Sequence, residues 1–179
     1  ALQSRALAGA GFAVLQPDLL GCGDSEGDFG DATWSDWVMD VIHAAQWLGA
    51  RHPEAPLWLW GLRTGCLLAC EATSRLAGPV NQLYWQPAVQ GRALLQQFLR
   101  VATAGQWLDG KNAAPEAAPT SHKAQLARGQ KVEVAGYLLS PGLASGLEAA
   151  RLAPPRDPAR AIWIEVSSRP NAELLPPTR

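Results

Sequence analysis

The sequence predicts an α/β fold in which a parallel sheet is flanked by helices. Apolar runs of strand length alternate with stretches of helical periodicity, and this alternation is typical of parallel sheets with right-handed crossovers. The chain of 179 residues is long enough for one domain with a substantial core. Its 47% hydrophobic and 17% charged residues are typical of globular proteins. These observations favour a single globular domain built on one sheet.

The charge balance and composition exclude several classes of function. A formal net charge of −1 gives no electrostatic basis for binding nucleic acid or an anionic membrane. No apolar run is long enough to span a bilayer, and the first residues show no signal-peptide pattern. Three cysteines without a regular spacing indicate a reducing compartment, so a cytoplasmic location is expected. No cofactor is expected, because the acidic loop Leu20–Gly27 lacks the glycine spacing of a dinucleotide site.

The first third of the chain predicts a helix, a strand and a second helix. Ala1–Gly9 carries apolar residues on one side, and a strand is predicted at Phe12–Gln16, with Asp18 at its carboxyl end. In Thr33–Gly49 apolar side chains recur three or four residues apart, which predicts a helix with one face toward the core. Thr33 and Asp36 have the spacing of a capping box, so the helix is expected to begin at Thr33.

The stretch Pro56–Cys70 organises the rest of the chain. A strand at Leu57–Trp60 leads to Gly61, and Gly65 opens a helix of small residues. Strand, Gly-x-x-x-Gly and helix is the layout of a nucleophile elbow, the sharp turn above an α/β-hydrolase sheet. Both glycines are expected to be required, because the turn is tight and neighbouring backbone comes close. The middle residue of this motif is usually Ser, and here it is Arg63.

The second half of the chain predicts a cap inserted into the sheet. Further strands are expected at Asn81–Trp85 and Ala161–Val166. Residues 1–87 and 153–179 would then form the core, and residues 88–152 a cap over the sheet edge. The elements expected in the cap are an amphipathic helix around Leu94–Ala102, a loop over Gly110–Gln130, a short strand at Val132–Leu139 and a helix from Ser140 to about Leu152.

Several motifs of the chain occur together: Asp18, the loop LLGCGDSEGDF, the Trp-rich helix, the elbow WGLRTGCLLA and the strand YWQP. In this combination they resemble the α/β-hydrolase superfamily. More narrowly, they resemble the exosortase A system-associated hydrolase 2 group, bacterial proteins found with exopolysaccharide and protein-sorting systems. The resemblance implies a further strand that precedes the helix ending near Gly9 and lies in the sheet between the strands at Phe12 and Leu57. It also implies a final strand and a loop with the triad histidine after Ala161–Val166. Neither part has a counterpart here. The resemblance therefore implies an incomplete chain that is poorly stable alone.

Arg63 stands where the resemblance implies a nucleophile. A guanidinium stays protonated and offers no lone pair, so it cannot attack a substrate. We interpret it as an anion site, because a guanidinium beside the free N–H groups of a helix start can hold a carboxylate or phosphate. The backbone N–H of Thr64 would be an oxyanion donor. Alternatively, Arg63 points to solvent or pairs with Asp18, two strand spacings or about 10 Å away; Asp18 itself is interpreted as an acceptor that organises its loop.

The other members of a catalytic triad are not apparent. Residues 86–88 and 167–169, which follow two of the strands, contain no carboxylate. Cys66 and Cys70 share one helix face but lack further ligands for zinc, so they are interpreted as packing residues and no metal site is predicted. The histidines are interpreted as structural side chains: His43, His52 and His122.

Two functions stay open at this point. The favoured one is a catalytically silent hydrolase-fold protein, a pseudoenzyme. It would bind a small anionic or acyl ligand, or a protein partner, in a sugar-polymer or protein-export system. The alternative is an esterase or acyl hydrolase with an atypical mechanism, whose nucleophile lies outside the elbow or whose water is activated by another group. A generic ester separates the two, since only the alternative predicts turnover above background.

Overall fold

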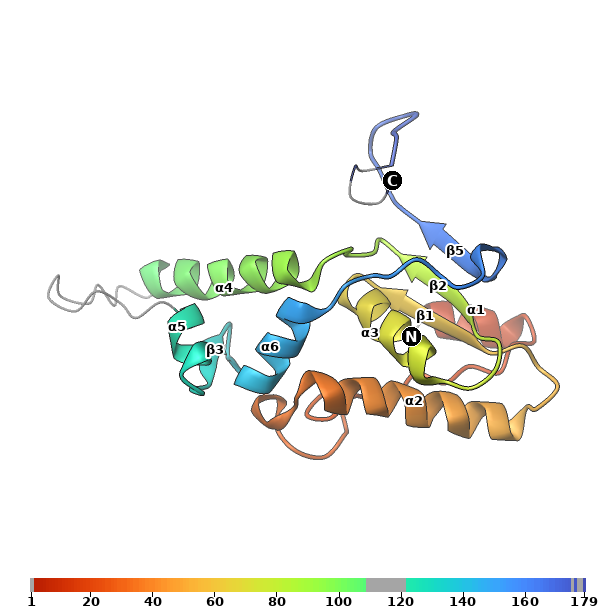
Figure 1. Ribbon diagram of the computed structural model, residues 1–179, viewed down its shortest axis with the longest axis horizontal. Helices are drawn as coiled ribbons and strands as arrows, with labels where there is room; N and C mark the ends of the chain where they lie inside the picture. The colour runs from red at the N-terminus through yellow and green to blue at the C-terminus, as the bar shows by residue number, and fades with distance from the viewer. Residues whose placement is uncertain (1, 109–121, 175, 177–178) are drawn as a thin grey trace, which may run out of the picture.

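Three parallel strands form the central sheet of the computed structural model, which describes residues 2–108, 122–174, 176 and 179 (Figure 1). The strands are β1 (Trp58–Leu62), β2 (Asn81–Trp85) and β5 (Ala161–Ile164), in the order β1-β2-β5. Both neighbouring pairs are parallel. The predicted α/β fold, a parallel sheet flanked by helices, is confirmed, and so is each of these three strands.

One face of the sheet is covered by α3 (Thr64–Arg75), which packs against β1 and β2. Leu59 lies beside Gln82 and Gly61 beside Tyr84 in the parallel register, so these four residues share that face. Tyr84 of β2 and Leu67 of α3 are among the most deeply buried side chains in the described part of the chain. The core therefore lies between this face of the sheet and α3.

The long helix α2 (Trp34–Arg51) packs against the outer side of α3 (Figure 1). Thr33 caps it, because its side-chain oxygen accepts a hydrogen bond from the Asp36 N–H while Asp36 Oδ2 accepts one from the Thr33 N–H at 2.9 Å. This is the predicted capping box. The indole of Trp34 donates a 2.7 Å hydrogen bond to Glu71 of α3, which links the two helices.

Between β2 and β5 the chain forms these described elements: α4 (Gly91–Leu108), α5 (His122–Ala127), β3 (Val132–Val134), β4 (Tyr137–Leu139) and α6 (Pro141–Ala149). The prediction of one strand over Val132–Leu139 is wrong. Ala135 and Gly136 adopt positive φ angles of 51° and 86° and turn the chain back, so β3 pairs antiparallel with β4. The prediction of a loop over Gly110–Gln130 is wrong at α5, and residues 110–121 lie outside the described residues. The assignment of residues 88–152 to a cap stays a prediction.

Glycines of α6 fit closely against the start of α2. A Cβ on Gly146 would lie 2.1 Å from the Trp34 Cβ, and one on Gly142 would lie 2.8 Å from a methyl carbon of Thr33. Ser140, which caps α6, also donates from its hydroxyl to the Ala32 carbonyl. The two helices therefore meet without room for a side chain at either glycine.

The amino-terminal segment differs most from the sequence prediction. α1 (Leu2–Gly9) forms as expected, but it contains no buried residue. The predicted strand at Phe12–Gln16 is wrong, because no described strand pairs with these residues and a strand needs a neighbour for its N–H and C=O groups. The loop that follows contains the short 3-10 helix η1 (Phe29–Asp31), and a second one, η2 (Pro158–Arg160), precedes β5. Among the described residues, no helix has the length and apolar character needed to cross a membrane.

Candidate functional site

The predicted elbow is present between β1 and α3. Arg63 is the single residue between the end of β1 and the start of α3, with φ 51° and ψ −109°. A non-glycine residue in this region of backbone space is strained and is held there by its surroundings. Its N–H donates to the Trp85 carbonyl at 3.0 Å, and its carbonyl accepts from the Cys66 N–H at 3.1 Å. The turn is therefore fixed by β2 on one side and by α3 on the other.

The two glycines of the elbow have different roles. A Cβ on Gly61 would lie 2.4 Å from the Cys66 nitrogen, so this position has no space for a side chain. A Cβ on Gly65 would meet nothing within 4 Å. The expectation that both glycines are required is therefore wrong for Gly65. Gly61 is required because it faces the first turn of α3, whereas Gly65 faces open space.

The side chain of Arg63 is exposed, on the carboxyl side of the sheet. Its Nη2 lies 3.5 Å from Oε1 of Gln97 on α4, which is the outer limit of a hydrogen bond. Among the ion pairs of the described residues, none involves Arg63. The positive charge of the Arg63 guanidinium is thus not neutralised by an ion pair with a described Asp or Glu side chain.

Asp18 organises its own loop, as the sequence interpretation proposed. Its Oδ2 accepts a hydrogen bond from the Asp24 N–H at 3.2 Å, and a Cβ on Gly23 would lie 2.5 Å from its carboxyl carbon. The loop therefore wraps around this carboxylate. The pairing of Arg63 with Asp18 that the sequence left open is not formed, and the structure does not bring these two predicted site residues together.

Thr64 is the first residue of α3, and its side chain is half-buried. The first N–H groups of a helix have no partner within the helix, and they carry the positive end of the helix dipole. Arg63 therefore stands beside a second source of positive potential. The role of the Thr64 N–H as an oxyanion donor stays a prediction.

No cysteine near the elbow replaces the missing serine. Cys66 is fully buried, and burial raises the pKa of its thiol to about 11, so it is protonated at neutral pH. Its Sγ lies 3.7 Å from the Trp85 carbonyl and packs rather than reacts. Cys22 is half-buried in the glycine-rich loop, and burial together with Asp18 and Asp40 raises its pKa as well.

The residue that follows β2 joins strands instead of supplying an acid. Gln86 has a φ of 46°, its N–H donates to the Ile164 carbonyl at 2.6 Å, and its Oε1 accepts from the Val166 N–H at 2.8 Å. The histidines lie elsewhere in the fold. His43 and His52 are exposed on α2 and at its end, and His122 is part of α5 rather than of a loop. Within the described residues no group of three His, Cys, Asp or Glu side chains could hold a metal ion.

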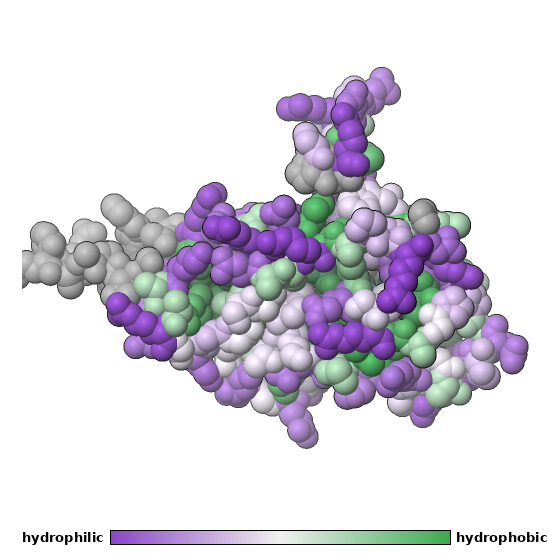
Figure 2. Space-filling model, viewed as in Figure 1, coloured by the Kyte–Doolittle hydropathy of each residue, from purple (hydrophilic) through white to green (hydrophobic). Residues whose placement is uncertain are grey.

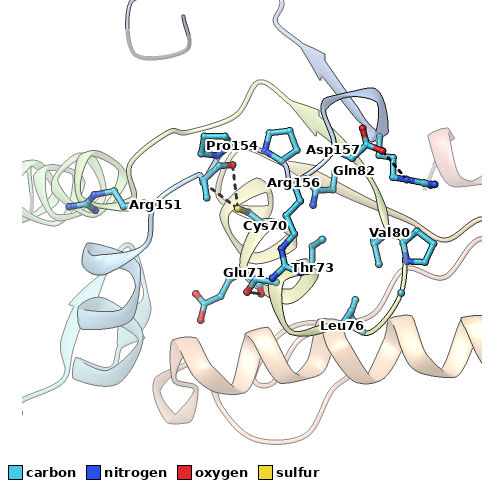
Figure 3. Close-up of a pocket in the computed structure, with 16 residues that line it drawn as sticks. Cys70, Glu71, Thr73, Leu76, Val80, Gln82, Arg151, Pro154, Arg156 and Asp157 are labelled. Carbon is cyan, nitrogen blue, oxygen red and sulfur yellow. Dashed lines mark hydrogen bonds and ion pairs between the residues drawn. The ribbon is translucent and has the colours of Figure 1, made fainter.

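A cavity of about 470 Å³ lies at the opposite end of the sheet (Figure 3). Its walls come from the second half of α3, the start of β2 and the segment that leads into β5. Sequence reasoning did not find this cavity. The positions that form it, such as Glu71, Gln82 and Arg156, are far apart in the chain and belong to no motif.

Comparisons with known proteins support the assignment that the elbow suggests. No curated protein matches the chain. The protein family described as "Serine aminopeptidase, S33" matches residues 3–134, which is more than half of the chain and includes the elbow. The chain therefore belongs to the serine aminopeptidase S33 family of the α/β-hydrolase superfamily.

Proposed function

We propose that this chain binds a small anion at the elbow and does not catalyse serine-type acyl transfer. The observation that carries the proposal is the position of Arg63. The strained turn that normally presents a nucleophile here presents a guanidinium without an acid partner among the described residues. Removal of the nucleophile of a serine hydrolase lowers kcat about 10⁶-fold.

The anion site would combine two features of the turn. Arg63 offers a planar fork of donors that matches a carboxylate or a phosphate group. The free N–H groups at the start of α3, beginning with Thr64, favour the same negative charge. The ligand would enter from the side of α4, where Gln97 is the present neighbour of the guanidinium. Asp18, which the sequence paired with Arg63, is not part of this site, because its carboxylate organises its own loop.

The narrower resemblance supports a biological setting for this site. Within the superfamily, the motifs around Asp18 and Arg63 are similar to those of exosortase-associated hydrolases. A protein of an export system or of exopolysaccharide production is accordingly the partner that we propose for the chain.

Acyl hydrolysis by an atypical mechanism is the second candidate. Two observations favour it: the family match, and the turn geometry, which is retained around Arg63. It would need a nucleophile outside the elbow, because the thiol of Cys66 is protonated and buried.

The test compares the wild-type chain with an Arg63→Ser variant. Both are treated with a fluorophosphonate probe and with short-chain p-nitrophenyl esters. We expect no labelling or turnover in the wild type, and a gain of labelling in Arg63→Ser if the turn can present a hydroxyl. Turnover by the wild type would establish the second candidate, and the labelled residue would identify its nucleophile.

Anion binding is tested by titration with inorganic phosphate, followed through the backbone amide resonances of Thr64 and Gly65. We expect these resonances to shift in the wild type and the affinity to fall by about tenfold to a hundredfold in Arg63→Gln, the range for charge-assisted hydrogen bonds. The control is Arg5→Gln on α1, an exposed arginine far along the chain from the elbow. Equal affinity in the wild type and in Arg63→Gln would contradict the proposed anion site.

A further inference from the structure

The cavity at the amino ends of the strands combines an apolar wall with donors for an anion. Figure 3 shows its lining side chains around an open centre, and in Figure 2 apolar surface is visible between hydrophilic side chains on this face. The apolar part of the lining consists of Leu76, Pro79, Val80, Pro154 and Pro155. A volume of about 470 Å³ falls within the range of small-molecule sites.

The acids in the lining are already paired. Glu71 forms an ion pair with Arg75 and also accepts from the Trp34 indole. Asp157 forms an ion pair with Arg160, at 3.3 Å between its Oδ2 and the arginine Nε. Both carboxylates therefore already have a cationic partner, Arg75 for Glu71 and Arg160 for Asp157.

Arg156 supplies the cation that lacks such a partner. Its side chain extends along the cavity toward Thr73 (Figure 3), and it makes no hydrogen bond or ion pair with the described residues. The guanidinium of Arg151, also in the lining, is engaged elsewhere, because it donates to the carbonyls at the end of α6 and interacts with the carboxylate of Glu148. The cavity therefore has an excess of positive charge at its mouth.

Gln82 supplies a neutral donor at the base of the cavity. The residue is 6% exposed, and its Oε1 accepts a hydrogen bond from the hydroxyl of Tyr84. Its NH₂ group donates no hydrogen bond within the described part of the chain. An amide that lines a cavity in this way has donors left for a ligand, because buried polar groups are normally paired.

We infer that this cavity binds a monocarboxylate with a compact apolar body. One unpaired guanidinium fits one negative charge, and its fork matches the two oxygens of a carboxylate. The Gln82 amide would donate to the same group, and the prolines and Val80 would contact the body. This site is separate from Arg63, which lies at the carboxyl end of β1, whereas Val80 and Gln82 lie at the start of β2.

The proposal is tested by calorimetric titration with 3-phenylpropionate. Two further titrants separate the chemistry: 3-phenylpropan-1-ol has the apolar body without the charge, and acetate has the charge without the body. We expect 3-phenylpropionate to bind at least tenfold more tightly than either. We also expect the side-chain NH₂ resonances of Gln82 to shift on binding. Equal affinity for the alcohol, or no binding of 3-phenylpropionate, would overturn the inference.

Variants locate the bound carboxylate. Arg156→Gln is expected to weaken binding about tenfold to a hundredfold. Arg156 is exposed, and no hydrogen bond or ion pair joins it to another described residue, so the variant should remain folded. The control variant Arg5→Gln is expected to bind like the wild type. Arg63→Ser is expected to keep the shift of the Gln82 side-chain resonances and to lose only anion binding at the elbow. Binding that survives in Arg156→Gln and is lost in Arg63→Ser would assign the ligand to the elbow and would overturn this site without touching the proposed function.

Discussion

The two faces of the central sheet carry similar side chains in different surroundings. On the face toward α3, Leu59 and Tyr84 are 9% and 1% exposed. On the other face, Trp58, Trp60 and Leu62 of the same β1 strand are 39%, 38% and 58% exposed. In the parallel register this exposed face continues across β2 to β5, where Ile162 and Ile164 are also exposed: Trp58, Trp60, Leu62, Leu83, Trp85, Ile162 and Ile164.

The difference shows that a strand residue is buried where a helix such as α3 packs on its face of the sheet, whatever the hydrophobicity of the strand. Strands that are apolar at nearly every position are typical of parallel sheets buried on both faces. On the exposed face, Trp60 and Trp85 stack with ring centroids 5.5 Å apart, so each shields part of the other from water. The remaining apolar surface is of the kind that marks an interaction site or an aggregation liability.

The largest expected effect comes from a matched pair of substitutions on one strand. Leu59→Ala removes a side chain from the face toward α3 and should lower the free energy of unfolding by about 2–5 kcal/mol, because a cavity is left behind. Leu62→Ala removes the same atoms from the exposed face and should change it by about 0.5 kcal/mol or less. Urea denaturation of both variants measures the difference. Equal losses would mean that the exposed face is covered in solution.

A smaller effect is expected at the helix that closes the covered side. Thr33→Ala removes the cap of α2 and should lower the free energy of unfolding by about 1 kcal/mol, because the Asp36 N–H loses its acceptor. Ser35→Ala, on the exposed side of the same first turn, serves as the control. Thermal unfolding followed by far-UV circular dichroism compares the two. A loss in Ser35→Ala as large as in Thr33→Ala would contradict the role of the cap.

The smallest expected effect is a loss of folding stability at acidic pH. Hydrogen bonds from Thr33 lower the pKa of Asp36, and a hydrogen bond from Lys131 lowers the pKa of Asp31. A carboxyl whose pKa is lower in the folded state stabilises the fold above its unfolded pKa, near 4, and this stabilisation is lost as the pH falls through the folded pKa.

Both carboxylates are close to solvent, so the loss should be modest. We expect the urea midpoint to be constant from pH 7 to about pH 5 and to fall below about pH 4. Asp36→Asn should flatten part of this fall, and a fall that begins near pH 6 would point to other groups.

Much of the sheet could be predicted from the sequence. The strands at β1, β2 and β5 are bounded by Gly or Pro, and the elbow is specified by Gly61 and by the small residues of α3. The strand at Phe12–Gln16 could not be judged in this way, because a strand depends on a partner that its own pattern does not contain. The hairpin of β3 and β4 could not be predicted, because its turn places Ala135 at a positive φ, a conformation that alanine rarely adopts.

The candidate site was predictable in part. The place of Arg63 at the turn follows from the spacing of glycines, so the sequence identified it. The neighbour of Arg63 could not be predicted from the sequence, because Gln97 lies on α4, 34 residues away in the chain. Asp18 was expected at the carboxyl end of a strand that the structure does not form, and its predicted role as an acceptor that organises its loop is confirmed.

The fit of α6 against α2 has a consequence for motion. Helix backbones that meet at Gly142 and Gly146 cannot slide past Thr33 and Trp34 without first separating. The base of the region between β2 and β5 is therefore anchored, and a rigid swing of that whole region is disfavoured. The start of α4 is fixed to the same anchor, because the Gly91 N–H donates to the Ala150 carbonyl at the end of α6, so Gln97 is held near the guanidinium by the same packing.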